Sequence, residues 1–345
     1  FYEPKGSLPS WVKEANAKVA KHVGKKLQVK GEGAGSGHSD DGPVDGYTRD
    51  VRIGDREAMV TPYGHAIIVD AAIGAMKHYK LGEQTDPDML WLGFSSVDYL
   101  GHGVGPNHRE MEESVVALDK QISRLLNYIK RSREDGLKGV VVVLTGDHGA
   151  PPMPSYLKRH RAKAGYIDAA SVRQRLNQHL DRRFSRGKMH RWVGGVAKLH
   201  FYLDRNVLKA VGVSKAEVER ASRDYLTNVP NVAYVAIGSE IREGRAGAGL
   251  LGRQIINGYY PGRSGDIVII PKPYFMPKVH GLTHITGYTY DRTVPLIFWG
   301  ERFRDRIFAN TPEMIDLVPT MALLLGFTAP ALSEGRVLHE VFRDK

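Results

Sequence analysis

The sequence predicts an α/β fold with a mostly parallel sheet flanked by helices and a small α+β insertion. Two apolar runs, DMLWLGFSS and GVVVVLTG, are separated by a strongly periodic helical segment at residues 109–132. Strand, helix and strand in this order imply a right-handed crossover between parallel strands. After residue 150 the pattern changes to short strands and helices, which indicates a second unit inserted into the first.

The first part of the chain is expected to build the main sheet and its helices. SLPSWVKEANAKVAKHV is predicted to be helical after Pro9, and a loop rich in Gly, Ser and Asp follows at residues 31–46. DMLWLGFSS is predicted to be a buried strand that ends at Asp98. The run HAIIVDAAIGAMKHY predicts a helix whose buried side carries Ile68, Ala72, Ala75, Met76 and Tyr79. The segment 109–132 repeats apolar residues at steps of four and three, as an amphipathic helix does.

The second part predicts the insertion and the return to the main sheet. AKLHFYLD and VAYVAIGSEI are predicted strands, and KAEVERASRDYLTNV is the helix between them. The main sheet is expected to resume with DIVIIPKP and VPLIFWG, followed by a final helix over PEMIDLVPTMALLLGF. The predicted units are 1–150 as part of the core, 151–265 as a cap-like subdomain and 266–345 as the C-terminal part of the core.

Composition limits the classes of function. The 345 residues are 42% hydrophobic and 25% charged, as in ordinary soluble globular proteins. No apolar run approaches the roughly 18 residues that a membrane span needs. The formal net charge of +11 favours anionic partners, but the basic residues lack the pattern of an RNA-recognition sheet or a helix-turn-helix. We therefore expect no nucleic acid partner, and we interpret the basic runs as solvated faces with some attraction for phosphate groups.

A set of histidines and aspartates indicates a metal site. The chain has no Cys, so any metal must be held by His and carboxylates. The candidate ligands are Asp98, His102, Asp147, His148 and His284, with His280 as a competitor of His284. Most of them stand at ends of predicted strands, where ligand sites of parallel sheets lie. Five ligands exceed what one zinc usually takes, and they suit two ions roughly 3.5–4 Å apart. Imidazole combined with carboxylate favours zinc over magnesium or calcium.

Taken together, the ordered motifs resemble a known superfamily. SVDYLGHGVGP, the helix with ALDKQI, LTGDHG, HGLTH and IDLVPTMALLLGF resemble the alkaline phosphatase superfamily. They look closest to its nucleotide pyrophosphatase/phosphodiesterase-like bacterial alkaline phosphatases, over most of residues 60–340.

The resemblance implies a ligand set for each of two zinc ions. One zinc would be held by Asp98, His102 and His284, and the other by Asp147 and His148. The second zinc would also take an aspartate and a Thr or Ser nucleophile from the N-terminal part of the fold. His284 is favoured over His280 because it stands in the Thr-His position ahead of a Tyr-Asp pair and a strand.

The nucleophile motif itself is not found in this sequence. No apolar strand ending in Asp-Gly and followed by a Thr or Ser nucleophile precedes Asp98. DDGPVDGYT, residues 40–48, contains the letters but follows a Gly-rich stretch instead of a strand. We therefore expect the nucleophile and the remaining Asp ligand to lie upstream of Phe1, and no catalytic residue in this chain.

The activity implied by the resemblance is zinc-dependent hydrolysis of phosphate monoesters through a covalent phosphoenzyme. One alternative is a phosphodiesterase or nucleotide pyrophosphatase with the same two-metal site, and another is a non-catalytic metal-binding fragment. Lys158, Arg159 and Arg161 are weak candidates for contacts to the phosphate oxygens. The family usually works in the periplasm or outside the cell. Any magnesium and the oligomeric state stay open.

Overall fold

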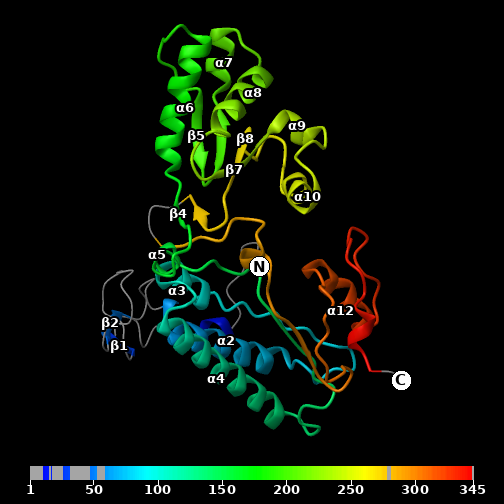
Figure 1. Ribbon diagram of the computed structural model, residues 1–345. Helices are drawn as coiled ribbons and strands as arrows, with labels where there is room; N and C mark the ends of the chain where they lie inside the picture. The colour runs from blue at the N-terminus through cyan, green and yellow to red at the C-terminus, as the bar shows by residue number, and fades with distance from the viewer. Residues whose placement is uncertain are drawn as a thin grey trace.

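The computed structural model describes residues 11–14, 17, 26–31, 47–52, 59–277 and 281–343. Figure 1 shows helices α2, α3 and α4 at one end of the molecule and the elements from α6 to α10 at the other, with β4 between them. The arrangement is mixed α/β, as the sequence predicts, but its sheets are small.

The elements of the first part are β1 (Lys26–Gly31), β2 (Tyr47–Arg52), α2 (Pro62–Tyr79), α3 (Ser96–Val104), α4 (Arg109–Ser132), β3 (Val142–Thr145) and α5 (Pro154–Arg159). The segment from residue 165 to residue 276, called the insertion below, contains β4 (Gly165–Tyr166), α6 (Ala169–Phe184), β5 (Val193–Ala197), β6 (His200–Leu203), α7 (Arg205–Val211), α8 (Lys215–Leu226), β7 (Val232–Ile237), α9 (Gly238–Arg242), α10 (Gly249–Asn257), β8 (Ile267–Pro271) and β9 (Phe275–Met276). The subdomain bounds 151–265 stay a prediction. The last part contains α11 (Thr289–Arg292), β10 (Leu296–Trp299), the 3-10 turns η2 (Met314–Asp316) and η3 (His339–Val341), and α12 (Leu317–Leu325).

The helices of the first part follow the periodicity of the sequence. Helix α4 has the predicted bounds, and its N-terminus is capped by His108, whose Nδ1 accepts from the amide of Glu110 at 3.3 Å. Helix α2 begins after Thr61, a favourable N-cap residue, and ends at Lys80 in the left-handed region (φ 53°). Tyr79, predicted on the buried side of α2, is exposed because it occupies the last turn before this break.

Two predictions near the N-terminus are only partly covered. Residues 11–14 and 17 are helical, and the rest of the segment predicted as the first helix lies outside the described residues. Strands β1 and β2 pair antiparallel and flank residues 32–46. Nearly all of the predicted loop 31–46 therefore lies outside the described residues.

The predicted parallel crossover is wrong for the described residues. DMLWLGFSS does not form a strand: residues 87–94 have no regular structure, and Asp98 lies inside α3. Strand β3 pairs with β10, and the pairing is antiparallel, with Leu144 opposite Ile297. The apolar run before α3 therefore has no strand partner in the described part of the chain. Without a partner, its backbone N–H and C=O groups cannot form the hydrogen bonds of a sheet.

The insertion contains the predicted strands and helix in a four-stranded sheet of order β5-β6-β8-β7, antiparallel throughout. DIVIIPKP belongs to this sheet as β8 and not to the main one, which corrects its predicted assignment. The buried carboxylate of Asp266 anchors it: Oδ2 accepts from the amide of Leu203, and Oδ1 accepts from Arg205, both at 2.8 Å. These contacts tie the start of β8 to β6 and to the first residue of α7.

The largest buried cluster lies in the insertion, between its sheet and helices α6, α7 and α8. Trp192, Phe201 and Leu176 are fully buried there. The indole nitrogen of Trp192 donates to Oδ1 of Asp181 at 2.8 Å, so burying this large ring leaves no polar atom unsatisfied. Among the described residues, no helix is long and apolar enough to cross a membrane.

Phe201→Ala should destabilise the insertion by about 3–5 kcal/mol, because it removes a fully buried aromatic ring and leaves a cavity. The measurement is urea unfolding followed by tryptophan fluorescence, since Trp192 belongs to the same cluster. The matched control is Met189→Ala, at a side chain 91% exposed, which should change the free energy of unfolding by less than about 0.5 kcal/mol. Equal midpoints for the two variants would contradict this packing.

Candidate metal centre

Helix α3 places Asp98 and His102 one turn apart on the same side. Its glycines permit close packing of the helix: a Cβ on Gly101 would lie 3.2 Å from Cε of Met111 on α4. Gly105 ends the helix with φ 82°, and a Cβ there would collide with the side chain of Met153. The carboxylate and the imidazole are therefore carried by a short helix fixed between α4 and the segment after β3.

The loop after β3 carries Asp147 and His148. The amide of Gly149 donates to the carbonyl oxygen of Asp291 at 2.7 Å, and a Cβ on Gly149 would collide with the backbone oxygen of Tyr290. Only glycine permits this close approach. The Asp-His-Gly loop is thus pressed against α11, which follows His284 in the chain.

His284 lies on a loop that is bound to α3. The amide of Leu282 donates to the carbonyl oxygen of His102 at 3.1 Å, and the carbonyl oxygen of Leu282 lies 2.8 Å from Nδ1 of His102. Further along, the buried carboxylate of Asp291 accepts from the amide and the hydroxyl of Thr286 at 2.8 and 2.6 Å. Both ends of the loop are therefore fixed.

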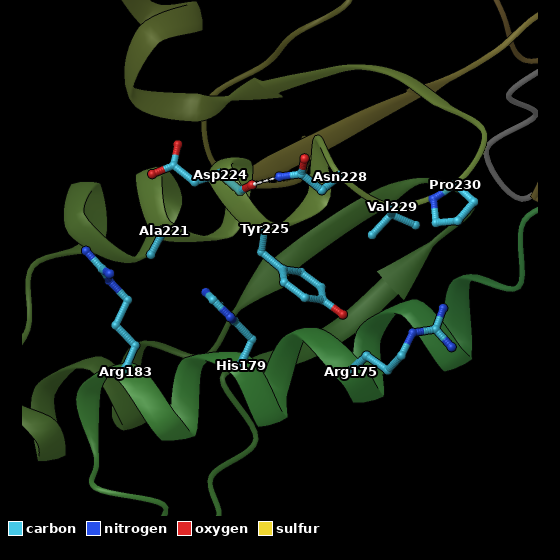
Figure 2. A pocket seen from close by; sticks show the side chains of 9 residues that line it. All are labelled: Arg175, His179, Arg183, Ala221, Asp224, Tyr225, Asn228, Val229 and Pro230. Carbon is cyan, nitrogen blue, oxygen red and sulfur yellow. Dashed lines mark hydrogen bonds between the residues drawn. The ribbon is translucent and has the colours of Figure 1, made fainter.

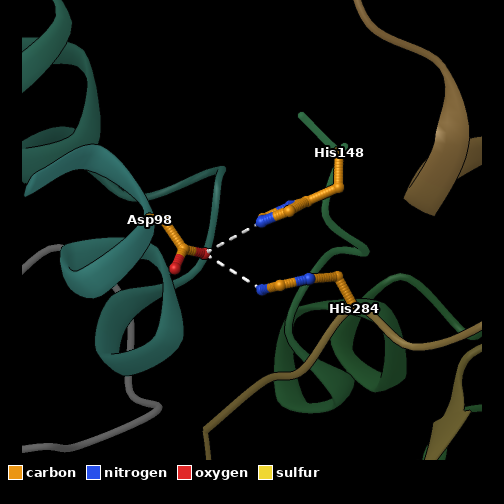
Figure 3. A group of neighbouring side chains, drawn as sticks. All are labelled: Asp98, His148 and His284. Carbon is orange, nitrogen blue, oxygen red and sulfur yellow. Dashed lines mark ion pairs between the residues drawn. The ribbon is translucent and has the colours of Figure 1, made fainter. Parts of the chain in front are cut away.

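Three side chains from these separate segments converge (Figure 3). Nε2 of His284 lies 3.0 Å from Oδ1 of Asp98, and Nε2 of His148 lies 3.8 Å from the same oxygen. The two imidazole rings stack with centroids 3.4 Å apart and planes within 12°. Among the described residues, Asp98, His148 and His284 form a group whose ligand atoms all lie within 4.8 Å of one another, close enough to hold a metal ion.

The other two predicted ligands border this group. Nε2 of His102 lies 3.5 Å from Oδ2 of Asp98 and 3.2 Å from Nε2 of His284. Oδ2 of Asp147 lies 3.6 Å from Nε2 of His148, but this carboxylate is 89% exposed. The structure thus brings all five together without separating them into the two sets that the resemblance implies. Their roles as ligands stay predictions.

The remaining site predictions are His280 and three basic residues. His280 lies outside the described residues. Lys158, Arg159 and Arg161 are exposed on and just after α5. They stay weak candidates for phosphate contacts.

The hydrogen bonds of the histidines suit metal coordination. Nδ1 of His102 faces the carbonyl oxygen of Leu282, and Nδ1 of His148 lies 2.9 Å from the carbonyl oxygen of Gly149. A carbonyl oxygen only accepts, so each Nδ1 carries the hydrogen, and in the neutral ring the lone pair is on Nε2. Both Nε2 atoms face the group. This is the arrangement by which ligating histidines are oriented in metal sites.

The charge state of His284 also suits metal coordination. Burial lowers the pKa of this imidazole, and His148 lowers it further, against the opposing effect of Asp98. The neutral ring, which is the form that binds a metal, is thereby favoured. Several nitrogen lone pairs and a carboxylate within contact distance repel one another unless protons or a cation lie between them. The donor set fits a divalent cation.

Asp291 and Gly149 are functional candidates to which the sequence analysis assigned no role. Burial raises the pKa of the Asp291 carboxyl, and Thr286 opposes that effect by donating to it. Its Oδ1 is buried without a hydrogen-bond partner. The signal for Asp291 in the sequence is the Tyr-Asp pair after His284.

A pocket of about 620 Å³ lies in the insertion, between α6 and α8 (Figure 2). Arg175, His179 and Tyr225 line it, and the rings of His179 and Tyr225 stack with centroids 4.7 Å apart. None of the predicted metal ligands belongs to its lining. This pocket is therefore distinct from the metal centre.

Gly149→Ala should weaken binding of a divalent metal and lower stability by about 1–3 kcal/mol, because the added methyl group forces the His148 loop away from α11. Thermal unfolding and titration with zinc measure the two effects. The matched control is Gly103→Ala, since a Cβ there meets nothing within 4 Å. If both variants bind zinc equally well, the Gly149 contact does not position His148.

The sequence is similar to that of known proteins. Residues 6–283 match the family described as type I phosphodiesterase / nucleotide pyrophosphatase. Alkaline phosphatase PafA of Elizabethkingia meningoseptica is 29% identical over 287 residues, which cover 81% of this chain and 50% of that protein. A protein of Myroides odoratus named calcium-transporting ATPase is 30% identical over 289 residues, with 82% and 52% covered. This chain thus spans about half the length of the curated relatives it matches.

A solved structure shows the same fold. The 1.7 Å crystal structure of wild type alkaline phosphatase PafA superimposes with a TM-score of 0.83 at 26% identity, covering 98% of this chain and 67% of that one. The resemblance inferred from the motifs is therefore confirmed. The chain belongs to the type I phosphodiesterase / nucleotide pyrophosphatase family and is homologous to PafA-like alkaline phosphatases over most of its length.

Proposed function

We propose that the protein containing this chain hydrolyses phosphate monoesters, with two zinc ions bound by the five predicted ligands and a covalent phosphoenzyme as intermediate. The observation that supports this most directly is the convergence of Nε2 of His148 and of His284 on Oδ1 of Asp98. Membership of a phosphoesterase family supplies the reaction class.

The residues of this chain would hold and orient the metals. The resemblance assigns Asp98, His102 and His284 to one ion and Asp147 and His148 to the other. Imidazole and carboxylate donors without Cys support zinc. Bound at this place, zinc would supply a Lewis acid for the oxygens of a phosphate ester. The backbone carbonyls at Nδ1 of His102 and His148 keep each Nε2 directed at the group, and the carboxylate of Asp98 balances cationic charge.

The nucleophile is proposed to lie outside this chain, as a Thr or Ser in the polypeptide upstream of Phe1. Thr286 is close to His284 in sequence, but its hydroxyl donates to the carboxylate of Asp291 at 2.6 Å. That hydroxyl is thereby committed to fixing the loop. The substrate is proposed to be a small phosphate ester, and the site of action the periplasm or the outside of the cell.

Two other functions are kept as alternatives. The family description favours a phosphodiesterase or nucleotide pyrophosphatase with the same metals. The lack of an assigned nucleophile in this chain motivates a non-catalytic metal-binding fragment. A phosphodiesterase would differ from the proposed phosphatase in the groups around the phosphate oxygens. A non-catalytic fragment would differ in having no turnover.

Asp98→Ala and His148→Ala should each lower zinc affinity by at least the roughly 10–100-fold that is lost when only a supporting residue around a metal is changed. Zinc content after dialysis, measured by mass spectrometry, checks this. His160→Ala is the control, because His160 is an exposed histidine whose Nδ1 contacts the backbone oxygen of Tyr156 on α5. Unchanged zinc stoichiometry in both ligand variants would rule out this metal centre.

Hydrolysis of an aryl phosphate monoester should exceed that of the matching diester when the protein includes the polypeptide upstream of Phe1 and zinc is supplied. Release of the aryl alcohol measures both reactions. The His148→Ala protein is the control for contaminating phosphatases. A preference for the diester would favour the phosphodiesterase alternative, and turnover of neither ester would favour the non-catalytic one.

A further inference from the structure

The pocket between α6 and α8 lies on the packed core of the insertion. Its volume of about 620 Å³ falls within the roughly 300–1,000 Å³ that small-molecule sites occupy in proteins. Two of its lining residues, Tyr225 and Val229, pack against the largest buried cluster, and a third, Ala221, belongs to that cluster. The walls of the pocket are therefore fixed by buried apolar contacts.

An aromatic pair stands in the middle of the pocket. Figure 2 shows His179 of α6 and Tyr225 of α8 reaching toward each other from the two helices. Their rings stack with centroids 4.7 Å apart and planes within 26°. Both side chains line the pocket, and both are only partly buried. The pair therefore offers a flat surface against which a further planar ring can pack.

The two ends of the pocket differ in charge. At one end Arg183 and Asp224 bring opposite charges (Figure 2). At the other end Arg175 lies near Pro230, and the hydroxyl of Tyr225 is directed to this side. No acidic residue lines that second end. A guanidinium, a hydroxyl donor and an apolar wall together suit an anionic group that is attached to a ring.

Arg175 differs from other basic residues of the insertion in its partners. Nζ of Lys215 lies 2.6 Å from Oδ1 of Asp266, and Nη1 of Arg223 lies 2.6 Å from Oε1 of Glu240. Arg175 forms no ion pair with any carboxylate in the part of the chain that the structure describes. Its charge is therefore not balanced by a direct contact of this kind.

The position of Arg175 in α6 does not explain its charge either. Cations in the last turn of a helix are favoured by the helix dipole, which accounts for Arg182 and Arg183, but Arg175 lies in the middle of the helix. Its charge acts on Asp168, the N-cap residue of α6. That carboxylate already accepts from the amides of Ala170 and Ser171 at 3.0 and 3.2 Å. The guanidinium thus stays available to a ligand.

The imidazole of His179 reports the positive field in the pocket. Burial lowers its pKa, and Arg182 and Arg183 lower it further, against the opposing effect of Asp224. The neutral ring is thereby favoured at neutral pH. An anion bound beside the ring would offset the effect of the arginines and stabilise the protonated form. Binding should therefore raise the pKa of His179.

We propose that this pocket binds a small organic anion with a planar ring, the ring packed against His179 and Tyr225 and its carboxylate or phosphate group on Arg175. The ring and the charge contribute together, because the pocket combines an aromatic surface with a single uncompensated cation at one end. The site is separate from the metal centre. The proposal therefore stands whether or not the protein hydrolyses phosphate esters.

The test measures binding to this chain by titration calorimetry. The probes are 2-naphthoate and 2-naphthylphosphonate, neither of which contains an ester that a phosphatase can hydrolyse. We expect at least one of them to bind. Two fragments, 2-naphthalenemethanol with the ring but no charge and acetate with the charge but no ring, should bind about tenfold more weakly or less.

Arg175→Gln should weaken binding of the ring anion by about tenfold or more, as expected for the loss of a hydrogen bond to a charged group. The matched control is Arg173→Gln, which removes the same charge from α6 at a position outside the pocket lining. It should change the affinity by less than about twofold, because an exposed charge at a distance is screened. Circular dichroism checks that both variants are folded.

A second measurement locates the ligand. The NMR signal of His179, assigned by its loss in His179→Gln, should titrate at higher pH when the ligand is present. His148→Ala should bind the ligand like the unchanged chain, since His148 does not line the pocket. Equal affinity of the Arg175→Gln protein would overturn the proposal, as would loss of binding in His148→Ala or no binding of either anion. None of these readouts depends on hydrolysis.

Discussion

The geometry of the candidate metal site depends on the binding of one loop to helix α3. Leu282 donates its amide to the carbonyl of His102 and places its own carbonyl at Nδ1 of the same residue, 180 positions away in the sequence. This pair of contacts fixes the ring of His102 and the start of the loop that carries His284. Because it uses both backbone polar groups of one residue, it determines position and direction together. These two contacts help to place His284 opposite Asp98.

Local patterns predicted the local elements of the fold well. The steps of three and four in α4 and the composition of AKLHFYLD and VAYVAIGSEI are properties of short segments, and the structure has a helix and strands there. The assignment of strands to sheets failed, because it depends on distant partners. DIVIIPKP joins the insertion through the contacts of Asp266 with Leu203 and Arg205, which no periodicity reveals. Apolarity of DMLWLGFSS indicates a need for burial, but it does not supply the neighbouring strand.

The residues of the candidate site were predictable where the type of side chain itself indicates the chemistry. The Asp-His pair at the end of an apolar run indicates Asp147 and His148, and the spacing of four indicates Asp98 and His102. His284 stands before a predicted strand, and the resemblance favours it over His280. The contacts that hold these residues in place were not predictable. They run through the backbone carbonyls of Leu282, Gly149 and Asp291, and any residue type provides a carbonyl. Such contacts appear only when the chain is folded.

The parallel pairing of β4 with β9 has a consequence for how this protein can vary. Gly165 lies beside Phe275, and the hydroxyl of Tyr166 donates to the carbonyl of Gly281 at 2.9 Å, so the chain enters and leaves the insertion at neighbouring points. The free energy of closing a loop rises only slowly with its length. Evolution can therefore lengthen, shorten or replace what lies between these two strands while His148 and His284 keep their separation. The insertion is a module whose history can differ from that of the metal centre that it interrupts.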